Sequence, residues 1–299
     1  MAEYSWALTD KDKKIAELKA EYYALTEADK LAKLREQFEK DYADEKYEDN
    51  PKIFVYTPTY NRGELLRDRA LKSVLNQTYK NFEYLVVGDC CDDETEQIVK
   101  EYGDERVKFF NVPQRAWRYP PSAENHWLTG PVVAANTALM MADGKWIARI
   151  DDDDCWVEDH LETMLKFAIE GNWEFVSGAL RGTRDGVESV VGGDHLYGDY
   201  YRIPYPNGDT SVYNPIIGGI STILFRSYLR YFEFNPDCWR KEHNRVNDID
   251  YLTRMGLMGV RMGYLDRVEL IMNPRPGADT IGSDAYRRDP DLAEKLFAF

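Results

Sequence analysis

The sequence predicts an α/β fold with a mostly parallel sheet flanked by helices, and three observations support this prediction. From residue 52 onward, short apolar runs rich in β-branched residues alternate with stretches of helical periodicity. Such alternation is typical of strands joined by crossover helices. Polar residues, several of them aspartates, follow directly on the apolar runs, and 299 residues suffice for one large domain or two small ones.

Residues 1–49 differ from the rest of the chain and predict a helical N-terminal extension. They are highly charged and almost free of Gly and Pro, and Asn50-Pro51 ends them. Apolar residues recur at helical spacing, with a cap-like break at residues 26–29, which favours two amphipathic helices. We expect these helices to pack on the main domain or on a second copy of the chain, which would make a homo-oligomer. The apolar positions are Ile15, Leu18, Tyr22, Leu25, Leu31, Leu34 and Phe38.

The segment 51–155 predicts four strands with helices between them. Its apolar runs end near Pro58, at Asp89 and in the acidic run after Ile150, so polar side chains collect at the ends of the strands. In an open parallel sheet, ligands bind in the crevice beyond those carboxyl ends. The predicted strands are 53–58, 82–89, 107–112 and 146–151, and the predicted helices are 65–75, 94–102 and 132–141.

The segment 156–276 has a less regular pattern, and 277–299 forms a tail. A Gly- and Tyr-rich stretch follows residue 180 and runs to Pro215. A long irregular segment inside a compact enzyme is more often a binding loop than filler. The predicted elements around it are a helix at 159–170, strands at 173–180 and 220–225, and a helix at 248–258.

Composition and charge exclude several classes of function. The net charge of -15 argues against binding to nucleic acid or anionic lipid. The N-terminus is charged where a secretory signal is apolar, and no apolar run is long enough to span a membrane, so we expect a cytoplasmic protein. Four cysteines without a Cys-x-x-Cys pair indicate neither a zinc site nor a disulfide framework. Cys90-Cys91 could be a redox pair, but small residues in a tight loop are the favoured interpretation.

Four consecutive aspartates, Asp151 to Asp154, follow the apolar strand at 146–151. An acidic run is usually a solvated loop. At the end of a buried strand, however, the mutual repulsion of these carboxylates must be offset by positive charge. A divalent cation would supply it, and hard oxygen ligands suit Mg²⁺ or Mn²⁺. The sequence therefore predicts a metal site, with a bare acidic turn as the alternative.

Five motifs in a fixed order carry a resemblance to a known family. They are TPTYNR (57–62), SVLNQTY (73–79), VVGDCCDDET (86–95), TGPVVAANTAL (129–139) and GKWIARIDDDD (144–154). In this order the chain resembles glycosyltransferase family 2, whose members are inverting, nucleotide-sugar-dependent enzymes of GT-A fold, over residues 51–276. The resemblance implies a GT-A domain with a nucleotide-binding half at 51–155 and an acceptor half at 156–276.

The resemblance also implies roles for the matching residues. Tyr60 would stack on the base, and Asp89 would accept a hydrogen bond from a base N–H. Asp151 or Asp152 would contact the ribose, while Asp153, with Asp151, would bind the metal that bridges the diphosphate. An aromatic platform beside an acceptor suits a flat heterocycle with an N–H edge, such as uracil; an aromatic at a strand end and a loop cap are the structural alternatives. The expected nucleotide-sugar site also includes Pro58, Asn61 and Asn136.

The sequence departs from the family pattern near this site. Gly88 stands where another Asp is common, and Cys90-Cys91 stand where Gly-Ser is usual, which would reshape the base contacts. Ala135 precedes Asn136 where an Arg often stands, so the cation that faces the diphosphate is left open. The candidates for that cation are Arg115, Arg118 and Arg149.

The acceptor half must supply a general base and lacks one metal ligand of some GT-A enzymes. The four histidines (His126, His160, His195 and His243) all precede Asp248, so a metal-binding His near the C-terminus is missing. The metal would then rely on Asp153, phosphate oxygens and water. The family places an acidic residue at the start of a helix here, which implies Asp248 as the base, with Asp250 as its rival and a helix cap as the structural alternative.

The sequence thus predicts a metal-dependent inverting glycosyltransferase that transfers a sugar from a UDP-sugar to a hydroxyl of a glycan or other acceptor, using Mn²⁺ or Mg²⁺. Processive members of the family carry membrane helices and a Gln-x-x-Arg-Trp motif, and this chain has no Gln after Gln114. One alternative is a sugar-phosphate nucleotidylyltransferase, which needs a Gly-rich basic loop that TPTYNRGE does not provide. The other is a non-catalytic carbohydrate-binding protein of the same fold.

Overall fold

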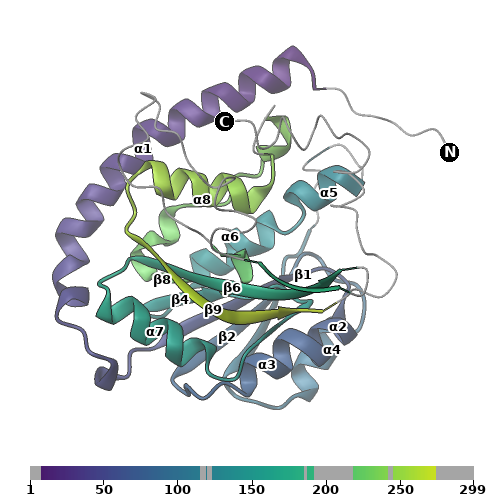
Figure 1. The fold of residues 1–299 in the computed structure, drawn as a ribbon. Helices are drawn as coiled ribbons and strands as arrows, with labels where there is room; N and C mark the ends of the chain where they lie inside the picture. The colour runs from purple at the N-terminus through teal and green to yellow at the C-terminus, as the bar shows by residue number, and fades with distance from the viewer. Residues whose placement is uncertain are drawn as a thin grey trace.

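A computed structural model describes residues 8–114, 119, 123–184, 187–191, 218–241 and 245–273. In these residues a sheet lies between helices, and a long helix borders the molecule on one side (Figure 1). This arrangement confirms the predicted α/β class. Several features named above lie outside the described residues: Arg115, Arg118, His195, His243, the stretch 192–217, the segment 277–299 and the side chain of His126.

The described strands form one sheet in the order β3-β2-β1-β4-β8-β6-β9-β5, with β7 paired to β6. β1 pairs with β2 and β4, and β2 pairs with β3, all in parallel. β8 runs antiparallel to both β4 and β6. The strands are β1 (Ile53–Thr59), β2 (Phe82–Gly88), β3 (Val107–Asn111), β4 (Trp146–Arg149), β5 (Asp154–Trp156), β6 (Phe175–Arg184), β7 (Val187–Val191), β8 (Leu224–Arg226) and β9 (Met262–Met272).

The parallel strands end level with one another. Thr59 is in register with Gly88, and Tyr56 with Arg149, so the residues that follow β1, β2 and β4 emerge at one edge. Every residue of β1 is buried, as expected for a central strand covered on both faces. Residues 51–155 therefore have the parallel core that the apolar runs predicted.

Helices pack on the sheet along both halves. α6 packs against β1 and β2, α4 against β3, and α7 against β6, β8 and β9. The helices are α2 (Gly63–Leu66), a π-helical turn (Arg67–Leu71), α3 (Lys72–Leu75), α4 (Thr95–Glu101), α5 (Ala123–Thr129), α6 (Val132–Met141), α7 (His160–Glu170) and α8 (Asn247–Leu257). Short 3₁₀ turns cover Tyr47–Asp49, Ile220–Thr222, Ser227–Tyr231 and Cys238–Arg240.

The N-terminal extension is one helix, α1 (Asp10–Ala43), so the predicted break at residues 26–29 is wrong. The Thr26 hydroxyl donates to the Tyr22 carbonyl one turn earlier (2.8 Å) instead of capping a new helix. The cap lies at Thr9, which forms a reciprocal capping box with Asp12. Glu27 is buried by a contact with α8, and a single-sequence pattern cannot show such a tertiary contact.

α1 packs on its own chain, passing along the outer side of α8 (Figure 1). Arg35 donates to the buried carboxylate of Glu174 (2.7 Å), and the Tyr42 hydroxyl donates to the Lys145 carbonyl. This confirms packing on the main domain. The outer positions Leu18, Tyr22 and Leu25 are exposed, and a homo-oligomer through α1 stays a prediction.

The predicted elements differ from the structure elsewhere too. The expected strand at 220–225 begins as a 3₁₀ turn because the Thr222 hydroxyl bonds to the Gly219 carbonyl (2.7 Å), and only β8 is extended. The expected helix at 65–75 contains the π-helical turn, and β5, β9 and α5 were not predicted. β5 is only three residues long and pairs with β9, so its extended shape depends on a partner distant in sequence.

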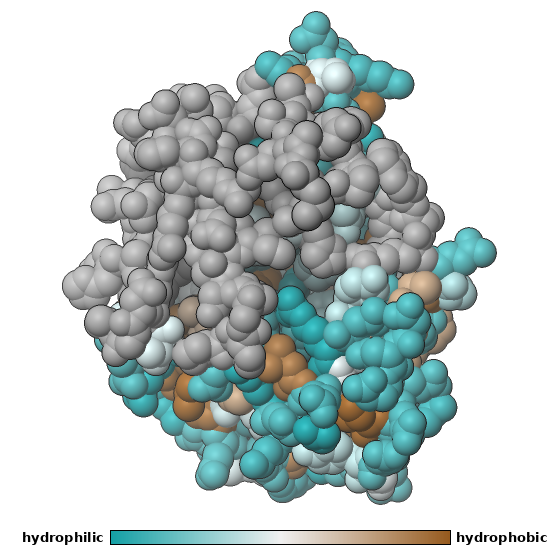
Figure 2. Space-filling model, turned by 90° about the vertical axis from the view of Figure 1, so that its right-hand side faces the viewer, coloured by the Kyte–Doolittle hydropathy of each residue, from teal (hydrophilic) through white to brown (hydrophobic). Residues whose placement is uncertain are grey.

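Hydrophilic residues cover most of the described surface seen in Figure 2, and hydrophobic ones form small separate patches. This view faces the side toward which the β1 and β6 arrows point in Figure 1. Among the described helices, none combines the length and apolar character needed to cross a lipid bilayer.

Candidate active site

The ends of β1, β2 and β4 are joined by hydrogen bonds at one edge of the sheet. The Thr59 hydroxyl donates to Oδ2 of Asp152 (2.7 Å), and the Asp89 backbone N–H donates to the Thr59 carbonyl (2.8 Å). Asp89 and Asp152 are both buried. The structure therefore brings together the residues predicted at the three strand ends.

Asn61 ties the loop after β1 to the loop after β2. Its side-chain N–H donates to Asp92 (2.6 Å), and its side-chain oxygen accepts from the Asp92 backbone N–H (3.0 Å). Asn61 has a φ of 50°, a left-handed conformation that Asn tolerates well. Two residues later the chain needs a glycine, because a Cβ on Gly63 would meet the Thr95 Cα at 2.9 Å. The Asn61 side chain thus links the two loops, and its nucleotide contact stays a prediction.

Cys90 and Cys91 shape the loop after β2. Cys90 has a φ of 63°, a conformation that glycine adopts easily, which accounts for the Gly usual in the resembled family. Asn111 brackets Cys91, accepting from its backbone N–H and donating to its carbonyl, both at 2.8 Å. Both thiols are free, and burial raises the pKa of the Cys91 thiol. These contacts favour the interpretation of small residues in a tight loop.

The remaining residues predicted to contact the nucleotide differ in side-chain exposure and in the hydrogen bonds that they already make. Tyr60 is 36% exposed and follows β1 directly, so its ring can offer a stacking surface. Pro58 is buried within β1, opposite Val87. Asn136 uses its amide to anchor α6, donating to the Phe234 carbonyl (2.9 Å) and accepting from its N–H (2.8 Å). The Asn136 amide is therefore committed to packing.

Arg149 and Asp151 form a partly buried pair behind the acidic run. The guanidinium bonds Oδ1 of Asp151 at 2.9 and 3.0 Å and lies over the Phe234 ring at 4.8 Å. Arg149 is only 2% exposed. Among the predicted diphosphate cations it is the one that the structure describes, and it is held inside the protein by Asp151.

Arg62 supplies the positive charge that faces the next two aspartates. Its Nη1 lies 3.1 Å from Oδ1 of Asp152 and 3.3 Å from Oδ2 of Asp153. Both carboxylates are almost fully buried, whereas the Arg62 side chain is 40% exposed. The acidic run predicted a positive charge here, supplied by a metal ion, and Arg62 was not assigned to it. The available signal was the position of Arg62 as the last residue of the TPTYNR motif (57–62).

The two facing carboxylates raise each other's energy when both are charged. Burial and the neighbouring charge of Asp153 raise the pKa of Asp152 to about 6, while Arg62 and the Thr59 hydroxyl oppose this rise. Removing Arg62 from this position would therefore leave two buried negative charges with less compensation. Such a pair attracts a cation.

The acidic run can bind a hard divalent ion only if phosphate oxygens or water complete its coordination. In the described part of the chain, no group of three His, Cys, Asp or Glu residues is arranged to hold a metal by itself. Asp152 and Asp153 direct carboxylate oxygens at one cation, the Arg62 guanidinium, and Asp151 lies beside them. The donor set therefore fits Mg²⁺ or Mn²⁺ completed by phosphate oxygens and water.

Asp248 and Asp250, the two candidate bases, have different surroundings. Asp250 bonds Lys241 (2.8 Å) and Arg254 (2.9 Å), and these cations lower its pKa although burial opposes the shift. Asp248 accepts from the N–H of Ile249 (2.9 Å). Burial raises the pKa of Asp248, and the charges of Arg149 and Asp151 are close enough to alter it. Asp248 thus lies within electrostatic reach of Arg149 and Asp151, whereas Asp250 is held in an ion network.

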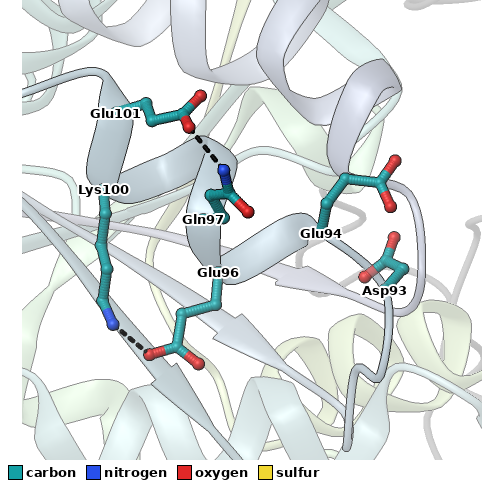
Figure 3. Close-up of a pocket in the computed structure, with 6 residues that line it drawn as sticks. All are labelled: Asp93, Glu94, Glu96, Gln97, Lys100 and Glu101. Carbon is teal, nitrogen blue, oxygen red and sulfur yellow. Dashed lines mark hydrogen bonds and ion pairs between the residues drawn. The ribbon is translucent and has the colours of Figure 1, made fainter.

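A surface hollow on α4 is a poor site for a nucleotide diphosphate. It is lined by four acidic residues, one glutamine and one lysine, and the lysine pairs with Glu96 (Figure 3). The negative charge of its rim would repel phosphate. The lining residues are Asp93, Glu94, Glu96, Gln97, Lys100 and Glu101.

Comparison with known families and proteins gives a consistent result. The family model described as Glycosyl transferase family 2 matches residues 54–119 and 123–231. The chain is 28% identical over 182 residues to the UDP-Glc:alpha-D-GlcNAc-diphosphoundecaprenol beta-1,3-glucosyltransferase WfgD of Escherichia coli. That match covers 61% of this chain and 63% of the relative, which is less than two thirds of its length.

Two solved structures share the fold at low sequence identity. One is S. aureus TarS 1-349 in complex with UDP-GlcNAc, with a TM-score of 0.54 at 20% identity over 82% of this chain and 66% of that chain. The other is the mannosyltransferase PcManGT of Pyrobaculum calidifontis in complex with GDP-Man and Mn2+, with a TM-score of 0.53 at 18% identity over 92% of this chain and 74% of that chain. At these identities the similarity establishes the fold alone.

Proposed function

The chain belongs to glycosyl transferase family 2, and from this we propose that it is a metal-dependent inverting glycosyltransferase that moves a sugar from a UDP-sugar to a hydroxyl of a glycan or other acceptor. One observation carries the proposal. Thr59, Asp89 and Asp152 come from three strand ends and are joined by hydrogen bonds at the carboxyl edge of the sheet. Ligands of open α/β sheets bind at this edge.

The donor base is proposed to be uracil. Tyr60 offers an exposed ring at the end of β1, and Asp89 offers a buried carboxylate at the end of β2. Together they suit a flat ring with an N–H edge. The TarS structure, which shares the fold, contains UDP-GlcNAc, whereas PcManGT contains GDP-Man, so the choice of base needs a direct test.

Transfer needs a stabilised leaving group and an activated acceptor. A divalent ion held by Asp153 and Asp151, and also within reach of the Asp152 oxygen that faces Asp153 across Arg62, would supply Lewis-acid neutralisation of the diphosphate. Asp248 is proposed to take the proton from the acceptor hydroxyl, as general bases do in inverting displacements. Burial raises its pKa, which makes its carboxylate a stronger base, while Arg149 keeps it from rising further.

The test measures release of free UDP from a panel of UDP-sugars with Mn²⁺, and again after the metal is chelated. Release that needs both metal and acceptor supports the proposal, and GDP-Man serves as the control for the base. Binding of UDP without any turnover would instead indicate a non-catalytic carbohydrate-binding protein. Pyrophosphate release from UTP and a sugar phosphate would indicate a nucleotidylyltransferase.

A further inference from the structure

We propose that Arg62 is an exchangeable counter-ion of the active site. It neutralises Asp152 and Asp153 when no donor is bound, and it turns to the donor diphosphate when a divalent ion takes its place between the two carboxylates. The inference rests on the proposed function and adds a residue that the family motifs did not assign.

Arg62 and a divalent ion would compete for the same carboxylate oxygens of Asp152 and Asp153. The guanidinium lies 3.1 Å from Oδ1 of Asp152 and 3.3 Å from Oδ2 of Asp153. The other Asp152 oxygen already accepts from the Thr59 hydroxyl (2.7 Å). An ion bound by this pair would need the oxygens that Arg62 now contacts, so the two cations exclude each other.

Contacts other than those of Arg62 hold Asp152 and Asp153 in place. Thr59 holds Asp152, and Arg69 donates to the backbone carbonyl of Asp153 (2.8 Å). Both aspartates are almost fully buried between the strand ends. The Arg62 side chain is 40% exposed and leaves the short loop between β1 and α2, so it can turn outward without unpacking the core.

The diphosphate needs a cation, and Arg62 combines contacts to the acidic run with a side chain that is 40% exposed. Ala135 stands where many family members have an arginine, and Arg149 is buried against Asp151. A guanidinium binds phosphate oxygens in a bidentate manner. When the metal enters with the donor, Arg62 loses two carboxylate contacts and gains a phosphate group within reach.

The experiment separates metal binding from nucleotide binding in the purified full chain. Mn²⁺ alone is titrated by electron paramagnetic resonance, and UDP and uridine are titrated by calorimetry in saturating Mn²⁺. In Arg62→Gln, Mn²⁺ alone is expected to bind more tightly by about tenfold or more, because a competing unit charge is removed. UDP is expected to bind about 10- to 100-fold more weakly, the loss of one charge-assisted contact, while uridine affinity is unchanged.

Two further variants complete the design. Arg62→Lys keeps the charge and should fall between wild type and Arg62→Gln for both ligands. Arg67→Gln on the same helical segment is the control, because Arg67 is exposed and pairs with Asp68, and it should behave as wild type.

The two affinities must move in opposite directions for the inference to stand. If Arg62→Gln weakens Mn²⁺, UDP and uridine together and lowers the melting temperature, Arg62 only supports the fold and the inference is wrong. Unchanged UDP affinity also overturns it. A wild-type chain that binds no UDP in Mn²⁺ would instead refute the proposed function, so the two failures are distinguishable.

Discussion

The side chains of Glu27 in α1 and Arg254 in α8 are in buried contact, although the two residues lie 227 positions apart in the sequence. The same guanidinium also bonds Asp250 (2.9 Å), so one cation serves two carboxylates. Burial and the charge of Asp250 outweigh the attraction of Arg254 and raise the pKa of Glu27 to about 7. The N-terminal helix is therefore coupled to the helix that carries the proposed base.

This pair predicts a pH dependence of stability. The folded protein keeps a proton on Glu27 up to about pH 7, whereas the unfolded chain releases it near the ordinary value of 4.5. Between these values the folded state binds more protons, so the contribution of Glu27 to stability is lost as the pH rises. In Glu27→Gln this loss should vanish, and the variant should gain stability relative to wild type across the window.

Urea unfolding of both proteins over this pH range measures the difference. Glu21→Gln is the matched control, because Glu21 is exposed on the same helix and should leave the pH dependence unchanged. A constant difference between Glu27→Gln and wild type at every pH would show that Glu27 does not bind the proton as described.

Deletion of residues 1–49 is expected to destabilise the whole domain. Tyr42 packs edge-on against Trp146 (5.5 Å between ring centroids), and Glu45 accepts from the Trp146 indole N–H (2.7 Å). Loss of a buried aromatic such as Tyr42 alone costs about 3 to 5 kcal/mol. Thermal unfolding should show a much lower midpoint or no cooperative transition. A truncated protein that melts like wild type would make α1 a dispensable accessory.

The sequence predicted the parallel half of the fold well for a physical reason. β1 and β2 are buried almost throughout, so their apolar runs are continuous and their ends are marked by polar residues. The continuity of α1 could not be predicted in the same way. Glu27, within the predicted break, contacts Arg254 in α8, and only the folded chain brings these two residues together.

The candidate site was predictable in position but not in contacts. Parallel strands end at one edge, so the meeting of Asp89 with the acidic run followed from the strand pattern. The directions of side chains do not follow from such a pattern. The Asn136 amide bonds Phe234, so its contact with the nucleotide stays a prediction, and Arg62 faces the aspartates without having been assigned.

Asp153→Asn is expected to weaken metal-dependent UDP binding by at least about tenfold, because one ligand charge is lost without a change in volume. The melting temperature should not fall, since Asp153 is a buried carboxylate beside Asp152. Calorimetry in Mn²⁺ and thermal unfolding measure the two effects. Asp143→Asn, at a side chain that is 88% exposed, is the control. Unchanged UDP affinity in Asp153→Asn would exclude this residue as the metal ligand.

Asp250→Asn tests whether Asp250 stabilises the fold through its ion network or acts as the general base. Asp250 bonds Lys241 and Arg254 inside the protein, so its loss leaves two cations with less compensation. Breaking one side of such a buried network typically costs about 3 to 5 kcal/mol. We therefore expect a lower melting temperature and, at temperatures where the variant stays folded, turnover within a few fold of wild type.

Asp248→Asn should show the opposite pattern and decide which aspartate is the base. Turnover should fall by about 10² to 10⁴, the usual range for lost acid–base catalysis, while UDP-sugar binding and melting temperature change little. Because the pKa of Asp248 is raised and the base must be a carboxylate, wild-type turnover should decline on acidification at a higher pH than an ordinary aspartate would allow. The residual activity of the variant should lack this decline. If Asp248→Asn loses about 1 kcal/mol of stability yet keeps normal turnover, Asp248 only stabilises the first turn of α8, where it follows the N-cap Val246 and accepts from the Ile249 N–H. In that event, a collapse of turnover in folded Asp250→Asn would transfer the role of base to Asp250.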